Sequence, residues 1–152
     1  KCNYGVIVPS NLYGPCDRHY GTQSAHYVTS LLYKLINANT KVLTIGGSGK
    51  PMRQFTYVDD VAKAIRLMVE YSDGDILNCA TPENMTIMEI AKRTIEANSL
   101  NFDIQLDPSF PDGQHRKDVS SVKLISKYDF EFTDFRHGIK DTYEWYKHNI
   151  TG

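Results

Sequence analysis

The sequence predicts an α/β fold in which part of a parallel sheet carries a smaller α/β lobe. Three observations support this class. Short apolar runs alternate along the chain with amphipathic segments of helical spacing, the first run is rich in β-branched residues, and turn-forming residues separate the segments. There is no internal repeat and no low-complexity linker, so 152 residues suit a single domain.

The first apolar run, residues 5–8, has the length and composition of a strand buried on both faces. It ends at Pro9, where the ladder no longer requires an N–H donor. In open parallel sheets, ligands bind just beyond the carboxyl ends of the strands. Residues 9–12 are therefore predicted to form the lip of a ligand site, although an ordinary exit from a strand fits this stretch equally well.

Four segments have the apolar periodicity of amphipathic helices, namely residues 24–38, 58–69, 86–97 and 135–148. Ser24 is the expected cap of the first helix, and Thr86 and Glu89 form a capping box at the start of the third. Asp59 and Asp60 fall in the first turn of the second helix, where free N–H groups stabilise carboxylates. A structural role is therefore favoured over a catalytic one for these two acids.

Further strands are predicted at residues 42–45, 53–57, 75–79 and 103–106. The glycine-rich residues 46–51 lack the spacing of a Walker phosphate loop, and no helix follows them. They are predicted to form a hairpin turn between the strands on either side. Turn-forming residues then lead into residues 114–118, a basic cluster predicted to lie on a loop.

Composition and charge argue against several classes of protein. The formal net charge is −1 at pH 7 and the basic residues are scattered among acids, so there is no electrostatic footprint for nucleic acid. No apolar run has membrane-spanning length. Cys2, Cys16 and Cys79 form no CxxC pair, which argues against a disulfide framework or a zinc site and fits a reducing cytosol.

The chain opens almost directly on its first predicted strand. A parallel strand needs neighbours joined by crossover connections, and the sequence supplies few candidates for them. The expectation is therefore that the chain is the C-terminal piece of a larger protein, or an otherwise incomplete one.

Basic side chains from separate segments are candidates for an anion site. They are Lys34 on the first helix, Arg53 after the glycine-rich turn, and Lys117 or Arg116 in the late basic cluster. If the lobe folds over the end of the first strand, these cations converge, which suits a phosphate or diphosphate ligand. Each one alone is more typical of a surface charge. His26 is a candidate general acid because histidine titrates near neutrality, although a lone histidine is more often structural.

Four motifs in this order resemble the extended short-chain dehydrogenases/reductases that act on nucleotide sugars. They are PSNLYGP at residues 9–15, SAH at 24–26, RQFTYVDDVA at 53–62 and PDGQHRK at 111–117. The second and fourth narrow the resemblance to the GDP-L-fucose synthase family, the 3,5-epimerase-4-reductases of GDP-4-keto-6-deoxy-D-mannose. The resemblance covers essentially the whole chain.

This resemblance implies that residues 1–152 form the C-terminal portion of an extended Rossmann-type fold, its last sheet strands plus a small α/β substrate-binding lobe. The N-terminal dinucleotide-binding half of the family carries a GxxGxxG loop, a Tyr-x-x-x-Lys pair, a catalytic cysteine and the dimer interface. The GxxGxxG loop does not occur in this chain, and its Tyr-x-x-x-Lys spacing, Tyr143 to Lys147, falls in the predicted last helix rather than in such a half. The chain alone is therefore expected to lack hydride transfer.

The resemblance also assigns roles by position. His26 falls where the family has its general acid for epimerisation, close to the cofactor. The residues implied to bind the cofactor, NADP(H), are Pro9, Ser10, Asn11, Leu12 and His26. Those implied to bind the substrate are Asn11, Lys34, Arg53, Asp112 and Lys117. No metal is implied.

Two positions depart from the family pattern. Lys34 replaces an arginine, which keeps the charge but loses the planar fork, and Gly46 replaces a tryptophan that often contacts substrate. Both departures suggest an altered sugar or nucleotide pocket.

The implied function is NADPH-dependent conversion of GDP-4-keto-6-deoxy-D-mannose to GDP-L-fucose, or of a related GDP-deoxysugar, by a cytoplasmic enzyme that is a homodimer when complete. One alternative is another nucleotide-sugar 4-reductase or 4-epimerase/dehydratase, for which His26 is a bystander. The other is a non-catalytic nucleotide-sugar-binding module.

Overall fold

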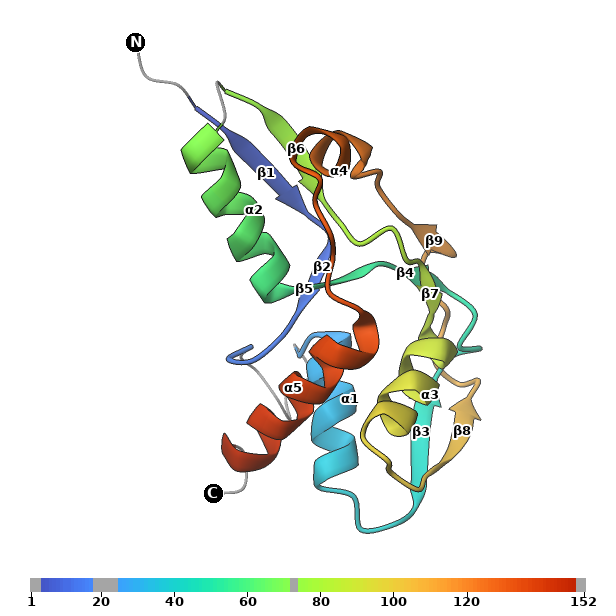
Figure 1. Ribbon diagram of the computed structural model, residues 1–152. Helices are drawn as coiled ribbons and strands as arrows, with labels where there is room; N and C mark the ends of the chain where they lie inside the picture. Colours follow the sequence, from blue (N-terminus) through green and yellow to red (C-terminus); the bar gives the residue numbers. More distant parts are fainter. Residues whose placement is uncertain (1–3, 18–24, 72–73, 150–152) are drawn as a thin grey trace.

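The computed structural model describes residues 4–17, 25–71 and 74–149, and strands alternate with helices along the chain (Figure 1). The strands are β1 (Val6–Pro9), β2 (Asn11–Tyr13), β3 (Val42–Gly46), β4 (Met52–Arg53), β5 (Phe55–Tyr57), β6 (Ile76–Cys79), β7 (Met85–Thr86), β8 (Asp103–Asp107) and β9 (Arg116–Lys117). The helices are α1 (Tyr27–Ile36), α2 (Val58–Tyr71), α3 (Ile87–Ala97), α4 (Val122–Tyr128) and α5 (Phe135–Asn149).

The sheets are small and mostly parallel. Within the described residues, β1 pairs with β6, β2 with β5 and β3 with β8, each in parallel, while β4 lies between antiparallel β7 and parallel β9. In Figure 1, β1, β6, α2 and α4 form an upper group, and α1, α3, α5, β3 and β8 form a lower group. Strands β2 and β5 join the two. This is the predicted α/β class, a piece of parallel sheet with a smaller lobe.

Each group has its own hydrophobic cluster. In the lower group, Leu32 of α1, Ile90 of α3 and Ile139 of α5 are fully buried. In the upper group, Leu77 of β6 and Leu124 of α4 are fully buried. Burying each of these aliphatic side chains stabilises the fold by roughly 1.5–3 kcal/mol. Packing in the two clusters therefore fixes the positions of β2 and β5, the strands that join the two groups.

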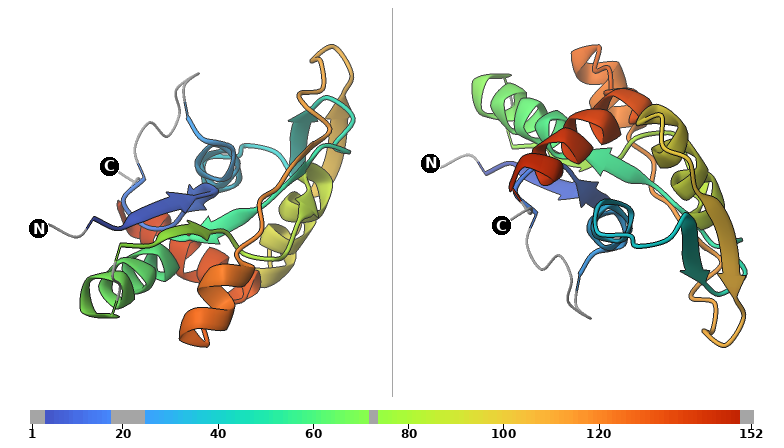
Figure 2. Two further views of the ribbon diagram at one scale, coloured as in Figure 1. Left: turned by 90° about the horizontal axis from the view of Figure 1, so that it is seen from above. Right: turned by 90° about the horizontal axis from the view of Figure 1, so that it is seen from below.

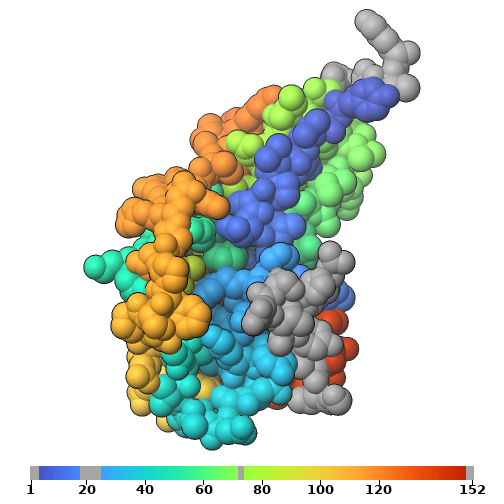
Figure 3. Space-filling view, turned by 180° about the vertical axis from the view of Figure 1, so that it is seen from behind, coloured from blue at the N-terminus to red at the C-terminus, as the bar shows by residue number. Residues whose placement is uncertain are grey.

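The prediction that the first strand is buried on both faces is wrong. Helices α2 and α4 lie on one side of the β1–β6 pair (Figure 2). Ile7 packs into the upper cluster on that side, while Val6 and Val8 stay 45% and 42% exposed, beside Ile76 at 65%. Side chains alternate along a strand, so these three share the uncovered face, and β1 runs along the surface in Figure 3.

The predicted hairpin at residues 46–51 is also wrong. β3 pairs with β8 instead of with the strand after the turn, and residues 53–57 divide between β4 and β5 in two separate sheets. Gly47 and Gly49 adopt left-handed φ angles of 80° and 70°. The segment then crosses the start of α3, where the amide of Met88 donates to the carbonyl of Gly49 at 3.0 Å. Residues 46–51 therefore contact the start of α3 and do not form a hairpin.

Most predicted helices are confirmed, and their boundaries differ by a few residues. α3 has the predicted capping box, with Thr86 accepting from the Glu89 amide at 3.1 Å. α1 is shorter than predicted and His26 is its N-cap residue, while the predicted cap, Ser24, lies outside the described residues. α4 was not predicted. The basic cluster, predicted as a loop, contains the short strand β9.

Candidate active site

A pocket of about 690 Å³ opens where β1 passes into β2, and we call it the first pocket. Its volume lies in the range of small-molecule sites. All four residues predicted as the lip of a ligand site, Pro9, Ser10, Asn11 and Leu12, line it. The remaining lining residues are Tyr13, Gly14, Pro15, Cys16, Asp17, His26, Tyr27, Arg53, Phe55, Val58 and Ile87.

A second pocket of about 400 Å³ adjoins the first. Tyr27, Arg53 and Ile87 line both pockets and form a common wall. Two further predicted substrate residues, Lys34 and Asp112, line the second pocket, as does Gly46, the position that departs from the family pattern. The predicted site residues therefore divide between two adjoining spaces.

His26 lines the first pocket, and one nitrogen of its imidazole contacts Asp17. The side chain is 68% exposed, and its Nδ1 lies 3.1 Å from Oδ2 of Asp17. A carboxylate oxygen only accepts, so Nδ1–H donates and Nε2 remains available. The same Asp17 oxygen accepts from the Thr29 hydroxyl at 2.5 Å.

Asp17 is a site residue that the sequence reasoning missed. It lies in the polar stretch after Pro15, where acids are ordinarily solvated. Cys16, just before it, has a left-handed φ of 65°, unusual for a residue other than glycine. Asp17 lies nine residues before His26 in the sequence, and no helical or strand period links two residues at that separation.

Ser10 and Asn11 use their side chains to fix the pocket wall. The Ser10 hydroxyl hydrogen-bonds with that of Thr56 at 2.8 Å, and Asn11 Nδ2 donates to the carbonyl of Gln54 at 3.0 Å. These bonds join the β1–β2 segment to β5. The segment can therefore present a rigid edge to a ligand.

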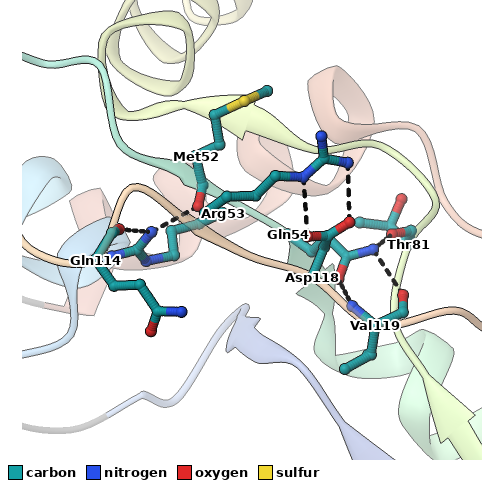
Figure 4. A network of polar contacts seen from close by, with 8 residues as sticks. Met52, Arg53, Gln54, Thr81, Gln114, Asp118 and Val119 are labelled. Carbon is teal, nitrogen blue, oxygen red and sulfur yellow. Dashed lines mark hydrogen bonds and ion pairs between the residues drawn. The ribbon is translucent and has the colours of Figure 1, made fainter.

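Two of the predicted cations come together in the second pocket. Lys34 Nζ donates to the carbonyl of Thr44 at 3.2 Å, and Arg53 Nη1 donates to the carbonyls of Met52 and Gln114 at 2.6 and 2.7 Å (Figure 4). Both side chains line that pocket. These bonds hold each long side chain in one place at the wall of the second pocket.

Lys117 does not join these two cations. It is the register partner of Arg53 in the β4–β9 pair, but it is exposed and lines neither pocket. Arg116, the alternative, donates from Nε and Nη2 to Asp118 at 2.9 Å each, so a carboxylate already neutralises it. The predicted convergence is therefore met by Lys34 and Arg53 and not by the late cluster.

Gln54 ties this cluster to the sheet. It is 4% exposed, its Nε2 donates to the carbonyls of Thr81 and Val119, and its Oε1 accepts from the Val119 amide (Figure 4). A buried amide with three partners is well satisfied. Gln54 therefore holds Val119, at the end of the late segment, beside the sheet, and the sequence analysis did not predict this role.

Asp112 is a surface carboxylate held by a turn. Its two oxygens accept from the amide of Ser48 at 2.8 Å and from the Ser48 hydroxyl at 2.6 Å. These hydrogen bonds lower the pKa of Asp112. Asp112 therefore stays ionised and fixes residues 111–113 over Gly47 at the rim of the second pocket.

The other titratable groups near the first pocket are poor proton donors. Burial raises the pKa of Tyr13 and of Tyr27 well above the ordinary value, and burial raises the pKa of the Cys79 thiol to about 11. All three stay protonated at neutral pH. Tyr27 also donates its hydroxyl to the carbonyl of Ile87 at 3.0 Å, which makes it a wall of the site.

Asp60 serves the fold, as the sequence indicated, but through a different partner. It is 4% exposed and accepts from the Thr133 amide and hydroxyl instead of from the free N–H groups of its own helix. Asp59 is exposed and lines neither pocket.

Comparison with known proteins identifies the family of this chain. Residues 1–80, more than half of the chain, match the model of the NAD dependent epimerase/dehydratase family. The chain belongs to this family. The matched residues include the lip of the first pocket, His26, Lys34 and Arg53, whereas Asp112 and Lys117 lie beyond them.

Relatives of this epimerase/dehydratase chain include a GDP-L-fucose synthase from Dictyostelium discoideum. The two are 33% identical over 154 residues, which is 97% of this chain and 48% of that protein. The chain thus spans about half the length of the curated relatives it matches. This confirms the predicted resemblance to the GDP-L-fucose synthases.

Solved structures share the fold. A GDP-L-fucose synthetase from Naegleria fowleri bound to NADP has a TM-score of 0.87 and 29% identity, over 95% of this chain and 45% of that one. A UDP-glucose 4-epimerase from Thermotoga maritima with UDP-glucose has a TM-score of 0.82 and 25% identity, over 97% and 47%. The predicted fold, part of an extended Rossmann-type enzyme, is confirmed.

In residues 4–17, 25–71 and 74–149, no three His, Cys, Asp or Glu side chains gather as a metal ion requires. Among the helices of those same ranges, none has both the length and the apolar character to cross a membrane.

Proposed function

We propose that this chain is the substrate-binding portion of an NADP-dependent nucleotide-sugar epimerase/reductase. The proposed substrate is GDP-4-keto-6-deoxy-D-mannose, converted to GDP-L-fucose, or a related GDP-deoxysugar. The observation that carries the proposal is a histidine oriented by a carboxylate in one pocket, across a common wall from a pocket lined by two cations. The GDP-L-fucose synthases among its relatives support the choice of substrate.

In this proposal the second pocket holds the nucleotide diphosphate and part of the sugar. Lys34 and Arg53 neutralise the diphosphate, and their bonds to backbone carbonyls orient them before the ligand arrives. Asp112 and Lys117 would contact the substrate from the late segment. Asp112 suits sugar hydroxyls, because an ionised carboxylate accepts hydrogen bonds from them.

His26 would act at the carbons that flank the 4-keto group. A base from the other half of the complete enzyme would take the proton when the C–H bond at such a carbon breaks, and the electron pair would form an enolate whose charge moves to the keto oxygen. His26 would then deliver a proton to the carbon on the opposite face, which inverts the centre and neutralises the enolate. Histidine suits this step because it exchanges protons near neutral pH.

The first pocket fits the nicotinamide end of a dinucleotide. Its wall combines flat or apolar side chains, such as Leu12, Phe55 and Ile87, with the polar edge of Ser10 and Asn11. NADPH, when bound, supplies the hydride that reduces the 4-keto group. Pro9, Ser10, Asn11 and Leu12 would position the ring, and His26 would lie beside it.

The proposal extends to the protein as a whole. The chain would be the C-terminal portion of its enzyme, since relatives are about twice as long, and the complete enzyme would be a homodimer assembled through the other half. A reducing cytosol is the proposed location, because exposed Cys16 and buried Cys79 are both free.

The test is solvent exchange at carbons 3 and 5. The complete enzyme, which includes the other half, is incubated with GDP-4-keto-6-deoxy-D-mannose in D₂O, and deuterium incorporation is followed by proton NMR. We expect exchange, and we expect His26→Asn to slow it by roughly 10²–10⁴-fold, the usual contribution of a positioned acid–base group. The control is His137→Asn, an exposed histidine on α5.

Two results would overturn the proposal. One is a complete absence of exchange with every GDP-4-keto sugar offered. The other is His26→Asn exchanging as fast as the parent protein, which would make His26 a bystander.

A second candidate function is 4-epimerisation of a nucleotide sugar without inversion at carbons 3 and 5. The likeness to the UDP-glucose 4-epimerase structure favours it. Incubation with UDP-glucose and NAD would then yield the 4-epimer, and His26→Asn would leave that rate unchanged.

A further inference from the structure

Asp17 is anchored by three hydrogen bonds from two helices, α1 with its N-cap residue and α5. Its Oδ2 accepts from His26 Nδ1 at 3.1 Å and from the Thr29 hydroxyl at 2.5 Å, and its backbone carbonyl accepts from the Tyr146 hydroxyl at 2.6 Å. Thr29 belongs to the first turn of α1, and Tyr146 belongs to α5. A residue 129 positions away therefore helps to set where this carboxylate lies.

The side chains of Asp17 and His26 differ in their exposure to solvent. The Asp17 side chain is 19% exposed and the His26 side chain 68% exposed. An exposed ring is free to meet a ligand, whereas a shielded carboxylate is free to hold that ring. A solvated surface pair would leave both partners exposed and would be worth little.

The direction of the bond selects the tautomer. A neutral imidazole carries its proton on one nitrogen, and the hydrogen bond that the other nitrogen makes decides which one. With Asp17 as acceptor, Nδ1 carries the proton and Nε2 keeps a lone pair. In the protonated ring, Nδ1–H stays with Asp17 and Nε2–H is the proton that can leave.

We propose that Asp17 is a positioning residue that holds His26 in the Nδ1–H tautomer, so that Nε2 alone exchanges protons with the substrate. The substrate part of this proposal rests on the proposed function. The tautomer part does not, because it concerns the protein without ligand. Thr29 and Tyr146 fix the position of Asp17, so that its carboxylate stays where it accepts from Nδ1 of His26.

The experiment is nitrogen-15 NMR of histidine-labelled protein without substrate. At about pH 9 an ordinary imidazole is neutral, and the shifts of its two nitrogens report which one carries the proton. We expect the Nδ1–H form for His26 in the parent protein and in Asp17→Asn, whose amide oxygen still accepts. We expect Asp17→Leu, which has no acceptor, to lose that preference.

Activity supplies a second readout. Asp17→Leu should slow deuterium exchange at carbons 3 and 5 while KM stays the same, within the roughly 10²–10⁴-fold that a positioned acid–base group contributes. Asp17→Asn should recover most of that rate. Asp59→Leu is the matched control, since it removes an exposed carboxylate that lines neither pocket, and it should leave the rate unchanged.

The outcomes are distinct. An Nε2–H tautomer in the parent protein overturns the proposal, whether or not any variant folds. An unchanged tautomer in folded Asp17→Leu overturns it too. The third outcome is the Nδ1–H tautomer in the parent protein, its loss in Asp17→Leu, and no deuterium exchange on GDP-4-keto sugars. That outcome would support the positioning role of Asp17 and contradict the proposed function.

Discussion

Asp60 joins two distant segments through a single buried carboxylate. Its oxygens accept from the Thr133 hydroxyl at 2.7 Å and from the Thr133 amide at 3.0 Å, across 73 residues of sequence. Because a buried charge is costly unless it is hydrogen-bonded, these bonds let the start of α2 lie inside the fold.

Replacing Thr133 by valine should therefore destabilise the protein. The shape is nearly conserved, but one lone pair of a buried carboxylate loses its donor, and we expect a loss of about 1.5–3 kcal/mol in the free energy of unfolding. Urea unfolding measures this loss. Thr40→Val, at an exposed position, is the control. Equal midpoints for both variants would show that the hydroxyl is not needed.

Single residues differ in how far the sequence revealed them. Lys34 and Arg53 were predicted because they are cations from separate segments, and His26 because histidine can act as an acid or base near neutral pH. All three line the pockets. Asp17 and Gln54 were not predicted. Polar residues in loops and short strands are normally solvated, and only the folded chain gives these two their partners.

At the scale of elements, the start of α3 depends on reciprocal capping. The Thr86 amide and hydroxyl both donate to Glu89 Oε2 at 2.8 Å. These two hydrogen bonds lower the pKa of Glu89 below its ordinary value of 4.5. A lowered pKa in the folded state stabilises the fold above that ordinary value, and the stabilisation is lost as the pH falls below it.

Thr86→Ala should accordingly cost about 1 kcal/mol at neutral pH, the usual loss for a helix cap. The difference from the parent should shrink as the pH falls from about 5 to about 3, because the parent loses its charged Glu89 partner there. Urea unfolding at several pH values measures it. Glu96→Gln, on the exposed last turn of α3, should show no such trend. A difference constant with pH would contradict the account.

Helices and strands also differed in how well the sequence predicted them. α2, α3 and α5 were predicted because their apolar stripe is a local pattern. α4 was missed because its seven residues bury only Leu124, too little for a stripe. The hairpin after β3 was predicted wrongly because its true partner, β8, lies about sixty residues on, and local turn chemistry says nothing about so distant a strand.

At the scale of the whole molecule, α5 closes over the strands that form the first pocket. A Cβ on Gly138 would lie 2.5 Å from the Tyr13 hydroxyl and 3.0 Å from ring carbons of Tyr57. Tyr13 is 2% exposed and lines the pocket. The absence of a side chain at Gly138 is thus what allows the C-terminal helix to approach.

Gly138→Ala sets two effects against each other. Alanine favours the helix by about 1 kcal/mol, but the buried tyrosines cannot move aside freely, and overpacking typically costs 1–3 kcal/mol. We expect the clash to prevail and the melting temperature to fall by several degrees. Lys140→Ala, on the exposed side of α5, should leave it nearly unchanged. A higher melting temperature for Gly138→Ala would show that α5 has room to shift.

The wall shared by the two pockets, made by Tyr27, Arg53 and Ile87, has a thermodynamic consequence. A ligand in one pocket that orders these three side chains would change the binding free energy of a ligand in the other pocket. Such cooperativity is reciprocal, since each occupant changes the affinity for its neighbour by the same factor. If the proposed ligands occupy both pockets, these three side chains are the contacts through which their binding would be coupled.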